Sequence, residues 1–481
     1  MVRYRGHLLA GSAALIALVP FVLDCSEQSL QTAQTTHPME AVETTAAESA
    51  LGLERVPQDI RQMLREMDDA NVERTIRRLV AFGSRNTLSA QDDPARGIGA
   101  ARDWLEAQFE AIAATSGGRM TVELQSYVQP PASRIPVPTR ITNVVATLRG
   151  TQAESVDRTY VVSGHYDSMC TDPVNAVCDS PGANDDASGV AAVVEMARVM
   201  ATRTFDATIV FMAVAGEEQG LYGSTYAASQ AKAAGRNIAG MFTNDIVGSS
   251  RADTGERDPR TVRVFAEGVP TAETPDEANI RRSVGGENDS PSRQLARFIK
   301  EVGENSATGM HVNIMYRRDR YRRGGDHIPF LQQGYPAVRF TEPHENYAHQ
   351  HQDVRVEGEV QYGDLPEFVD FAYTTRVAKV NAAALAALAR GPAAPKNLKI
   401  VTARLTNDTE LVWDANPEPD VAGYEIVYRE TTEPLWTDTI RAGNVTTYVV
   451  PNLSKDNYFF GVRAVDRDGH RSPVSFPRPS M

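Results

Sequence analysis

Carboxylates and one histidine follow several apolar segments of this 481-residue chain. The residues that end these segments or follow them directly are His165 and Asp167 in VVSGHYDS, Asp185 and Asp186 in PGANDDASG, Glu217 and Glu218 in AVAGEEQG, and Asp245 in MFTNDIVG. Adjacent carboxylates repel each other, and they are poorly solvated at the end of a buried strand. So many acids in one place are costly without a cation, which favours a divalent metal cluster.

Histidines that complete such a cluster are available further along the chain. Five of the nine histidines lie close together, and they are His311, His327, His344, His349 and His351. Imidazole and carboxylate ligands together suit zinc, which leaves a coordination position for water when the protein supplies three ligands. Each residue alone also has a structural explanation, since Asp185 or Asp186 would serve as a helix cap. Their joint placement favours the metal cluster.

The elements that must position these residues alternate between helices and strands from residue 57 to residue 390. ITNVVATLRG, RTYVVSGHYDS, ATIVFMAVAG and IAGMFTNDIVG are typical of strands, and DASGVAAVVEMARVMAT is typical of a helix. This alternation predicts an α/β fold, with a mainly parallel mixed sheet sandwiched by helices. Ligands of such sheets gather beyond the carboxyl ends of the strands, where the acids above are expected.

The composition changes after GPAAPKNLKI. Short alternating segments such as TELVWDA, GYEIVYRE and YFFGVRAVD are separated by the turn signals NPEPD and DRDG. This pattern predicts a small all-β sandwich over residues 395–481. The net charge of −13 argues against a nucleic-acid partner, which needs clustered basic residues.

The N-terminus has the layout of an export signal. Arg3 and Arg5 precede an apolar run from Leu8 to Leu23, which predicts a signal peptide over residues 1–24. A single anchor helix is the alternative. Residues 25–56 are rich in Ser, Thr, Ala and Gln, which predicts a disordered tether. We expect a periplasmic or extracellular location, with lipoprotein anchoring at Cys25 only weakly supported because Asp24 precedes it.

The chain has three cysteines, of which Cys170 and Cys178 are close in sequence. In an exported protein this spacing favours a local disulfide between them. A cysteine-based metal site would need more thiols.

Residues 58–390 resemble metallopeptidase family 28, the co-catalytic dizinc aminopeptidases. The motifs that carry the resemblance are GHYDS, PGANDDASG, GEEQGLYGS, the ND at 244–245, GGDHIPF and HQHQD. Any one of them is weak alone, and together they are specific. The C-terminal segment resembles a fibronectin type III domain, with Trp413, Tyr424, Leu453 and Tyr458 at positions that such domains use for their core.

The resemblance implies two zinc ions bridged by the Asp185 carboxylate. The remaining metal ligands that it implies are His165 and Asp245 for one ion, and Glu218 and His349 for the other. His349 is preferred over His351 because the family's ligand histidine lies four residues before an aspartate, here Asp353.

The resemblance also implies that Glu217 is the general base and that Asp167 orients a metal ligand. Some family members hold the oxyanion with a tyrosine directly before the last ligand histidine, but this chain has Ala348 there. Tyr321 is the preferred substitute, and Tyr347 is the other candidate.

These inferences describe an exported zinc aminopeptidase that acts on peptides, with a C-terminal domain suited to attachment to a surface or polymer. A carboxypeptidase or a glutaminyl cyclase-like enzyme on the same fold stays open, and so does a non-catalytic binding scaffold. The preferred N-terminal residue and the oligomeric state do not follow from the sequence.

Overall fold

The computed structural model describes residues 57–480. The predicted signal peptide and tether, with Cys25, lie outside these residues and stay predictions. Within residues 57–480, no helix combines the length and the apolar character that crossing a membrane requires.

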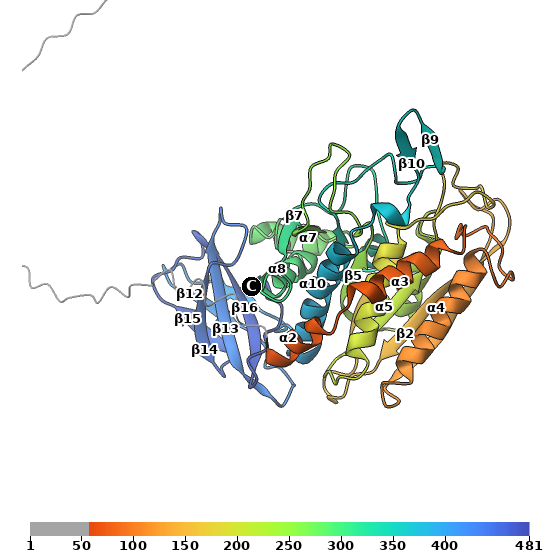
Figure 1. The fold of residues 1–481 in the computed structure, drawn as a ribbon. Coiled ribbons are helices and arrows are strands. Elements are labelled where there is room, and N and C mark those ends of the chain that lie inside the picture. The colour runs from red at the N-terminus through yellow and green to blue at the C-terminus, as the bar shows by residue number, and fades with distance from the viewer. Residues whose placement is uncertain (1–56, 481) are drawn as a thin grey trace, which may run out of the picture. The chain divides into compact units, whose positions relative to one another are not determined.

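An eight-stranded mixed sheet forms the centre of the larger part of the fold (Figure 1). Its order is β1 (Met120–Gln129), β2 (Thr139–Leu148), β4 (Thr208–Val214), β3 (Arg158–His165), β5 (Asn237–Asn244), β8 (Ala337–Thr341), β6 (Thr261–Phe265) and β7 (His311–Met315). The pairs β4–β3, β3–β5, β5–β8 and β6–β7 are parallel, and the other neighbours are antiparallel. The predicted mainly parallel mixed sheet is confirmed.

Helices cover both faces of this sheet, and each face has its own apolar core. On one face Tyr160 and Val162 of β3 pack in the main core, and on the other face Val161 packs in a smaller one. Alternate side chains of a strand point to opposite faces, so a strand buried on both faces is an almost continuous apolar run. This explains why RTYVVSGH is apolar at nearly every position.

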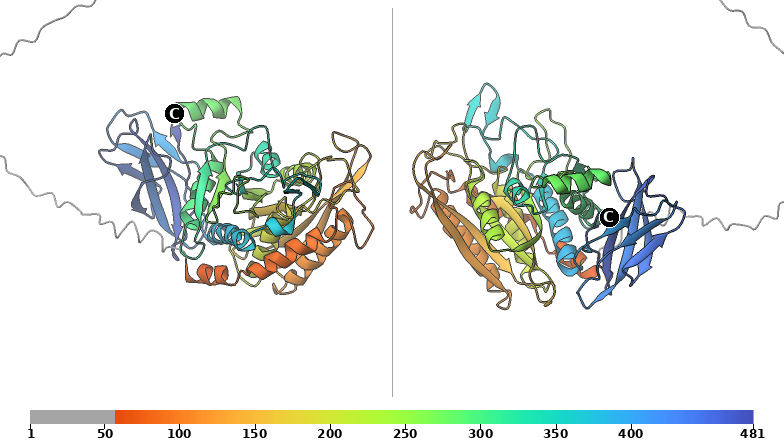
Figure 2. Two further views of the ribbon diagram at one scale, coloured as in Figure 1. Left: turned by 45° about the horizontal axis from the view of Figure 1, so that its top comes forward. Right: turned by 180° about the vertical axis from the view of Figure 1, so that it is seen from behind.

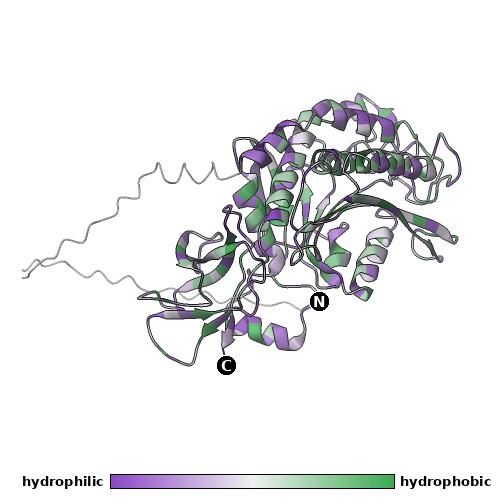
Figure 3. Ribbon diagram, turned by 90° about the horizontal axis from the view of Figure 1, so that it is seen from below, coloured by the Kyte–Doolittle hydropathy of each residue, from purple (hydrophilic) through white to green (hydrophobic). Residues whose placement is uncertain are grey.

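The main core includes residues from α2 (Gln58–Arg65), α3 (Asp69–Val80), α4 (Ile98–Ala113), α5 (Ala187–Met200), α8 (Pro291–Gly303) and α10 (Phe371–Arg390). The smaller core includes residues from α6 (Tyr222–Ala233) and α9 (His327–Gln332). Polar and apolar residues are interleaved along the covering helices (Figure 3). In α3, for example, the buried side chains of Val72, Ile76 and Leu79 recur at helical spacing.

Residues after α10 form a β-sandwich (Figure 2). One sheet has the order β15 (Thr447–Val450), β12 (Thr409–Val412), β11 (Lys399–Val401) and β17 (Arg478–Ser480). The other has the order β14 (Asp438–Gly443), β13 (Val421–Glu430) and β16 (Tyr458–Asp466). Trp413 and Tyr424 are buried in its core, and Leu453 and Tyr458 pack against that core. The predicted all-β sandwich is confirmed.

Buried ion pairs join the sandwich to the rest of the chain. Arg158 Nη1 lies 2.9 Å from Glu418 Oε1, and both side chains are at most 5% exposed. Arg429 Nη2 of β13 lies 2.8 Å from the buried carboxylate of Asp289. Leu435 packs against the main core. The sandwich therefore packs against the larger part of the fold through buried ion pairs and apolar contacts.

This interface makes Glu418 a sensitive position for stability. Glu418→Gln leaves the Arg158 guanidinium buried without its carboxylate partner, which costs about 3–5 kcal/mol when one member of a buried pair is removed. We expect chemical denaturation to show a loss of unfolding free energy of this order. Glu410→Gln, which breaks the exposed Arg404–Glu410 pair, is the control and should change the free energy of unfolding by less than about 1 kcal/mol. Equal small effects would contradict a buried, ion-paired interface.

Candidate metal centre

Three neighbouring parallel strands end at one edge of the sheet, and candidate ligands lie at or just after these ends. His165 is the final residue of β3, Glu217 and Glu218 follow β4 after the turn Ala215–Gly216, and Asp245 follows β5. His165 is in register with Val214 of β4, and Ser163 is in register with Thr243 of β5. The strands therefore end at the same level, and their terminal side chains meet.

The turn before α5 brings the remaining carboxylate. Asp186 is the N-cap of α5, and its side chain accepts hydrogen bonds from the backbone N–H groups of Gly189 at 3.0 Å and His165 at 3.0 Å. A Cβ atom on Gly189 would lie 2.3 Å from Asn244 O, so only glycine lets α5 start this close to β5. Asp186 is thus the cap, and its neighbour Asp185 is free to face His165.

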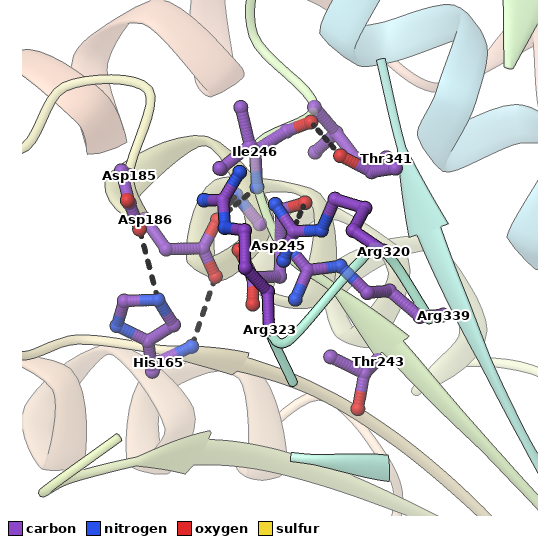
Figure 4. Close-up of polar contacts among 12 residues, drawn as sticks. His165, Asp185, Asp186, Thr243, Asp245, Ile246, Arg320, Arg323, Arg339 and Thr341 are labelled. Carbon is purple, nitrogen blue, oxygen red and sulfur yellow. Dashed lines mark hydrogen bonds and ion pairs between the residues drawn. The ribbon is translucent and has the colours of Figure 1, made fainter. Parts of the chain in front are cut away.

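Two groups of possible metal ligands share Asp185. The first is His165, Asp185 and Asp245, and the second is Asp185, Glu218 and His351. His165 Nε2 lies 3.1 Å from Asp185 Oδ1 on one side, and His351 Nε2 lies 2.8 Å from Asp185 Oδ2 on the other. Figure 4 shows Asp185 above the His165 ring, with Asp245 beside it. The sharing of one carboxylate by two groups is the arrangement expected of a bridging ligand.

The structure brings His351, and not the expected His349, to Asp185 and Glu218. His351 Nε2 also lies 3.2 Å from Glu218 Oε2, whereas His349 stacks on Phe368 with ring centres 3.7 Å apart. His351 adopts a left-handed backbone with φ of 55°, which re-aims the chain within the turn. The spacing to Asp353 predicts His349, but His349 does not lie with this group of carboxylates.

The carboxylate that reaches the Asp185 loop is Asp364, which lies beyond the β-hairpin of β9 (Arg355–Glu357) and β10 (Val360–Tyr362). Its side chain accepts hydrogen bonds from the backbone N–H groups of Asn184 at 2.9 Å and Asp185 at 2.7 Å. The hairpin separates His351 from this aspartate in the sequence.

The donor atoms of this cluster fit a metal. His165 Nε2 and Glu218 Oε1 are buried and have no hydrogen-bond partner among the described residues. Burial alone would lower the pKa of His351, but the carboxylates of Glu218 and Asp185 raise it to about 11. A proton on the His351 imidazole therefore offsets part of the negative charge of these carboxylates. Zinc, which imidazole and carboxylate ligands suit, would offset that charge instead.

Asp167 holds the ligands in place from behind. Its carboxylate accepts hydrogen bonds from the Glu218 N–H at 3.1 Å and the Thr87 hydroxyl at 3.1 Å. Its backbone carbonyl lies 3.1 Å from His165 Nδ1. A proton on Nδ1, donated to this carbonyl, leaves the Nε2 lone pair facing Asp185 and free for a metal. This geometry suits the orienting role that we expect of Asp167.

Arg85 is a further supporting residue, which sequence reasoning missed. Its buried guanidinium donates to the backbone carbonyls of Tyr166, Pro181 and Gly182, and so it ties the His165 loop to the Asp185 loop. Burial lowers the pKa of Arg85 to about 10. The segment GSRNT has no metal-ligand character, so nothing in its residue types indicated this role. The same holds for Asp364, whose partners lie far away in the sequence.

Glu217 is partly exposed beside the cluster, unlike the buried Glu218. Desolvation is the largest effect on Glu217 and raises the pKa of its carboxyl, and the nearby Asp245 and Glu218 carboxylates add to the shift. A partly exposed carboxylate with a raised pKa, beside a group of possible metal ligands, is suited to proton transfer.

Tyr321, the expected oxyanion group, is not brought to the cluster. Its side chain is 83% exposed, and the guanidinium of Arg317 lies 3.8 Å from the centre of its ring. Tyr347 is also exposed, at 60%. Within residues 57–480, no hydrogen bond joins either phenol to a residue of the two ligand groups.

The disulfide between Cys170 and Cys178 is confirmed. It closes the loop that follows Asp167, and Thr171 within this loop exchanges two hydrogen bonds with Asp353, at 3.2 and 3.1 Å. The disulfide loop is thereby tied to the segment that carries His351.

Comparisons with known proteins relate both parts of the chain to known families. The family model "Peptidase family M28" matches residues 143–357, and the model "Fibronectin type III domain" matches residues 393–479. A probable zinc metalloprotease of Leptosphaeria maculans is 53% identical over 422 residues, which are 88% of this chain and 97% of that protein. A probable zinc metalloprotease of Pyrenophora tritici-repentis is 53% identical over 437 residues, 90% of each chain.

Among solved structures, the LapA aminopeptidase of Legionella pneumophila is 20% identical, with a TM-score of 0.47 over 69% of this chain and 76% of that chain. The glutaminyl cyclase of Porphyromonas gingivalis is 17% identical, with a TM-score of 0.45 over 66% of this chain and 98% of that chain.

The role of His351, as opposed to His349, as a metal ligand can be tested directly. We expect His351→Asn to lose zinc on dialysis, because the second ligand group then keeps only two carboxylates. His349→Asn is the matched control, and it should keep the zinc content of the unchanged chain because it removes only the stack on Phe368. Elemental analysis of both dialysed proteins measures the difference. Loss of zinc from the His349 variant alone would instead identify His349 as the ligand.

Proposed function

Because this chain belongs to peptidase family M28, we propose that it is an exported aminopeptidase that uses two zinc ions to remove N-terminal residues from peptides. The observation that carries this proposal is the pair of ligand groups that share Asp185, with Glu217 beside them. The naming of close relatives as probable zinc metalloproteases supports zinc as the metal.

The two ions would be held by the residues of the two groups. His165, Asp245 and the shared Asp185 would hold one ion, and Glu218, His351 and Asp185 would hold the other. Bound zinc supplies Lewis-acid chemistry, which polarises a carbonyl group and makes water a nucleophile at neutral pH. Asp167, Arg85 and Asp364 keep the ligand loops in register for this purpose.

Glu217 would move the proton. It follows β4 next to the ligand Glu218, so one strand end supplies both a metal ligand and a base. Its carboxylate would accept a proton from the attacking water and donate it to the leaving amine of the peptide. The raised pKa of Glu217 suits both steps, since the group must take up a proton and release it again.

Export is supported by two separate features. The N-terminal residues have the charge and apolar pattern of a signal peptide. The disulfide between Cys170 and Cys178 belongs to the kind that persists in oxidising compartments. The C-terminal domain would serve attachment to a surface or polymer, which rests on its fibronectin type III fold alone.

Substitution of the base tests the chemistry. We expect Glu217→Gln to keep its zinc and to lose about 10²–10⁴-fold in kcat, because the amide has the shape of the carboxyl group but accepts no proton. Glu256→Gln, at a glutamate whose side chain is 68% exposed, is the control and should turn over normally. Retained turnover in the Glu217 variant would rule out its role as general base.

A substrate panel tests the exopeptidase class. We expect hydrolysis of an aminoacyl anilide, loss of that activity with a chelator, its return with zinc, and no hydrolysis of the N-acetylated anilide. Release of the C-terminal residue from an N-acetyl peptide would instead identify a carboxypeptidase. Cyclisation of an N-terminal glutamine without hydrolysis would identify a cyclase, and no turnover of any substrate would favour a binding scaffold.

A further inference from the structure

A run of arginines lies between β7 and α9. Residues 317–323 read RRDRYRR, which is five arginines in seven positions of a chain with a net charge of −13. A charge run of this kind is usually a solvated face, and Arg318 and Arg322 are indeed exposed. The side chains of Arg320 and Arg323 are instead partly buried.

Both of these arginines contact Glu345. Arg320 Nη1 lies 3.0 Å from Glu345 Oε2, and Arg323 Nη1 contacts the same oxygen. Arg263 Nη2 lies 3.2 Å from Glu345 Oε1. Three guanidinium groups therefore surround one carboxylate, and Arg320 is also paired with Asp319, with Nε 3.1 Å from Asp319 Oδ1.

These groups lie next to the metal centre. Glu345 and Asp185 line the same pocket. Arg339 Nη2 lies 2.7 Å from Oδ1 of the ligand Asp245, and its Nη1 lies 3.8 Å from Asp319 Oδ2. Figure 4 shows Arg320, Arg323 and Arg339 grouped around Asp245. The four guanidinium groups therefore lie among the carboxylates of Glu345, Asp319 and Asp245.

Arg323 is the arginine of this cluster that a substrate can reach. Its side chain is 30% exposed, compared with 10% for Arg320, 17% for Arg263 and 0% for Arg339. A guanidinium group has five N–H donors in a planar fork. Within residues 57–480, the only side chain that accepts a hydrogen bond from Arg323 is Glu345. The remaining donors accordingly have no side-chain acceptor among these residues.

We propose that Arg323, supported by Arg320, binds a carboxylate of the substrate beside the metal centre. The preferred substrates are then peptides that carry a carboxylate close to the cleaved bond. An acidic side chain and the free C-terminus of a short peptide offer the same chemistry to this site. This inference rests on the proposed peptidase function, and it names the substrate class that the same site selects.

The test compares peptides that differ by a single carboxylate. One pair is Glu-Ala-Ala-amide and Gln-Ala-Ala-amide, which tests an acidic side chain, and the other is Ala-Ala and Ala-Ala-amide, which tests the C-terminus. We expect the wild-type zinc enzyme to prefer the carboxylate-bearing member of at least one pair. Arg323→Gln should lower kcat/KM for that member by about 10- to 100-fold, the range of a charge-assisted hydrogen bond, and for the neutral member by less than about 2-fold.

Arg322→Gln is the matched control, because it removes one charge from the same loop at an exposed position. It should leave both members of each pair within about 2-fold. Loss of preference in this variant would show a diffuse effect of loop charge and would overturn the assignment to Arg323. Equal losses on both members in the Arg323 variant would show a structural role, and absence of any preference in the wild type would also overturn the proposal.

A binding measurement separates this proposal from the proposed function. Propionate and propionamide, which differ by one carboxylate, are titrated calorimetrically into the zinc-loaded wild-type protein and into the zinc-loaded Arg323→Gln protein. We expect the wild type to bind propionate at least about 10-fold more tightly than propionamide, and the variant to lose this preference. This result would support the carboxylate site even if no peptide were cleaved, in which case only the proposed peptidase function fails. Equal binding of both ligands by the wild type would overturn the carboxylate site even in an active peptidase.

Discussion

The Asp185 carboxylate lies within 3.1 Å of the Nε2 atoms of both His165 and His351, and the surrounding structure is arranged to keep it there. The two histidines lie on chain segments far apart in sequence. Such a carboxylate between two imidazoles, with further acids beside it, is stable only if positive charge is shared among them. The cluster therefore needs positive charge. The loops that carry its residues are held in place by the rest of the fold.

Each loop is held by a group that is not itself a ligand. Asp186 joins the start of α5 to the end of β3, Asp167 joins β3 to the turn after β4, and Asp364 accepts the N–H of Asp185. Arg85 ties the His165 and Asp185 loops through their carbonyl groups. Because these contacts fix the backbone, the ligand side chains are in position before a metal arrives, which lowers the cost of binding it.

The sequence allowed the strand-end residues to be predicted because their position depends on local order. A buried apolar run ends at a definite residue, and parallel neighbours end at the same edge, so His165, Glu218 and Asp245 could be placed together. His351 could not, because its place beside Asp185 and Glu218 depends on the path of an irregular turn in which His351 itself has a left-handed backbone. The role of Arg85 was hidden for a related reason, since its partners lie more than 80 residues away in the chain. The sandwich was predictable from its alternating strands, but its buried ion pairs with the larger part of the fold were not.

The central claim is that Asp185 bridges two zinc ions, with His351 as a ligand of one of them. Diffraction from crystals of the zinc-loaded protein, measured on both sides of the zinc absorption edge, tests it most directly. Our account predicts two anomalous peaks, each about 2.0–2.2 Å from an oxygen of Asp185, with one beside His165 and Asp245 and the other beside Glu218 and His351. A single peak, or a second peak bound by His349, would contradict it.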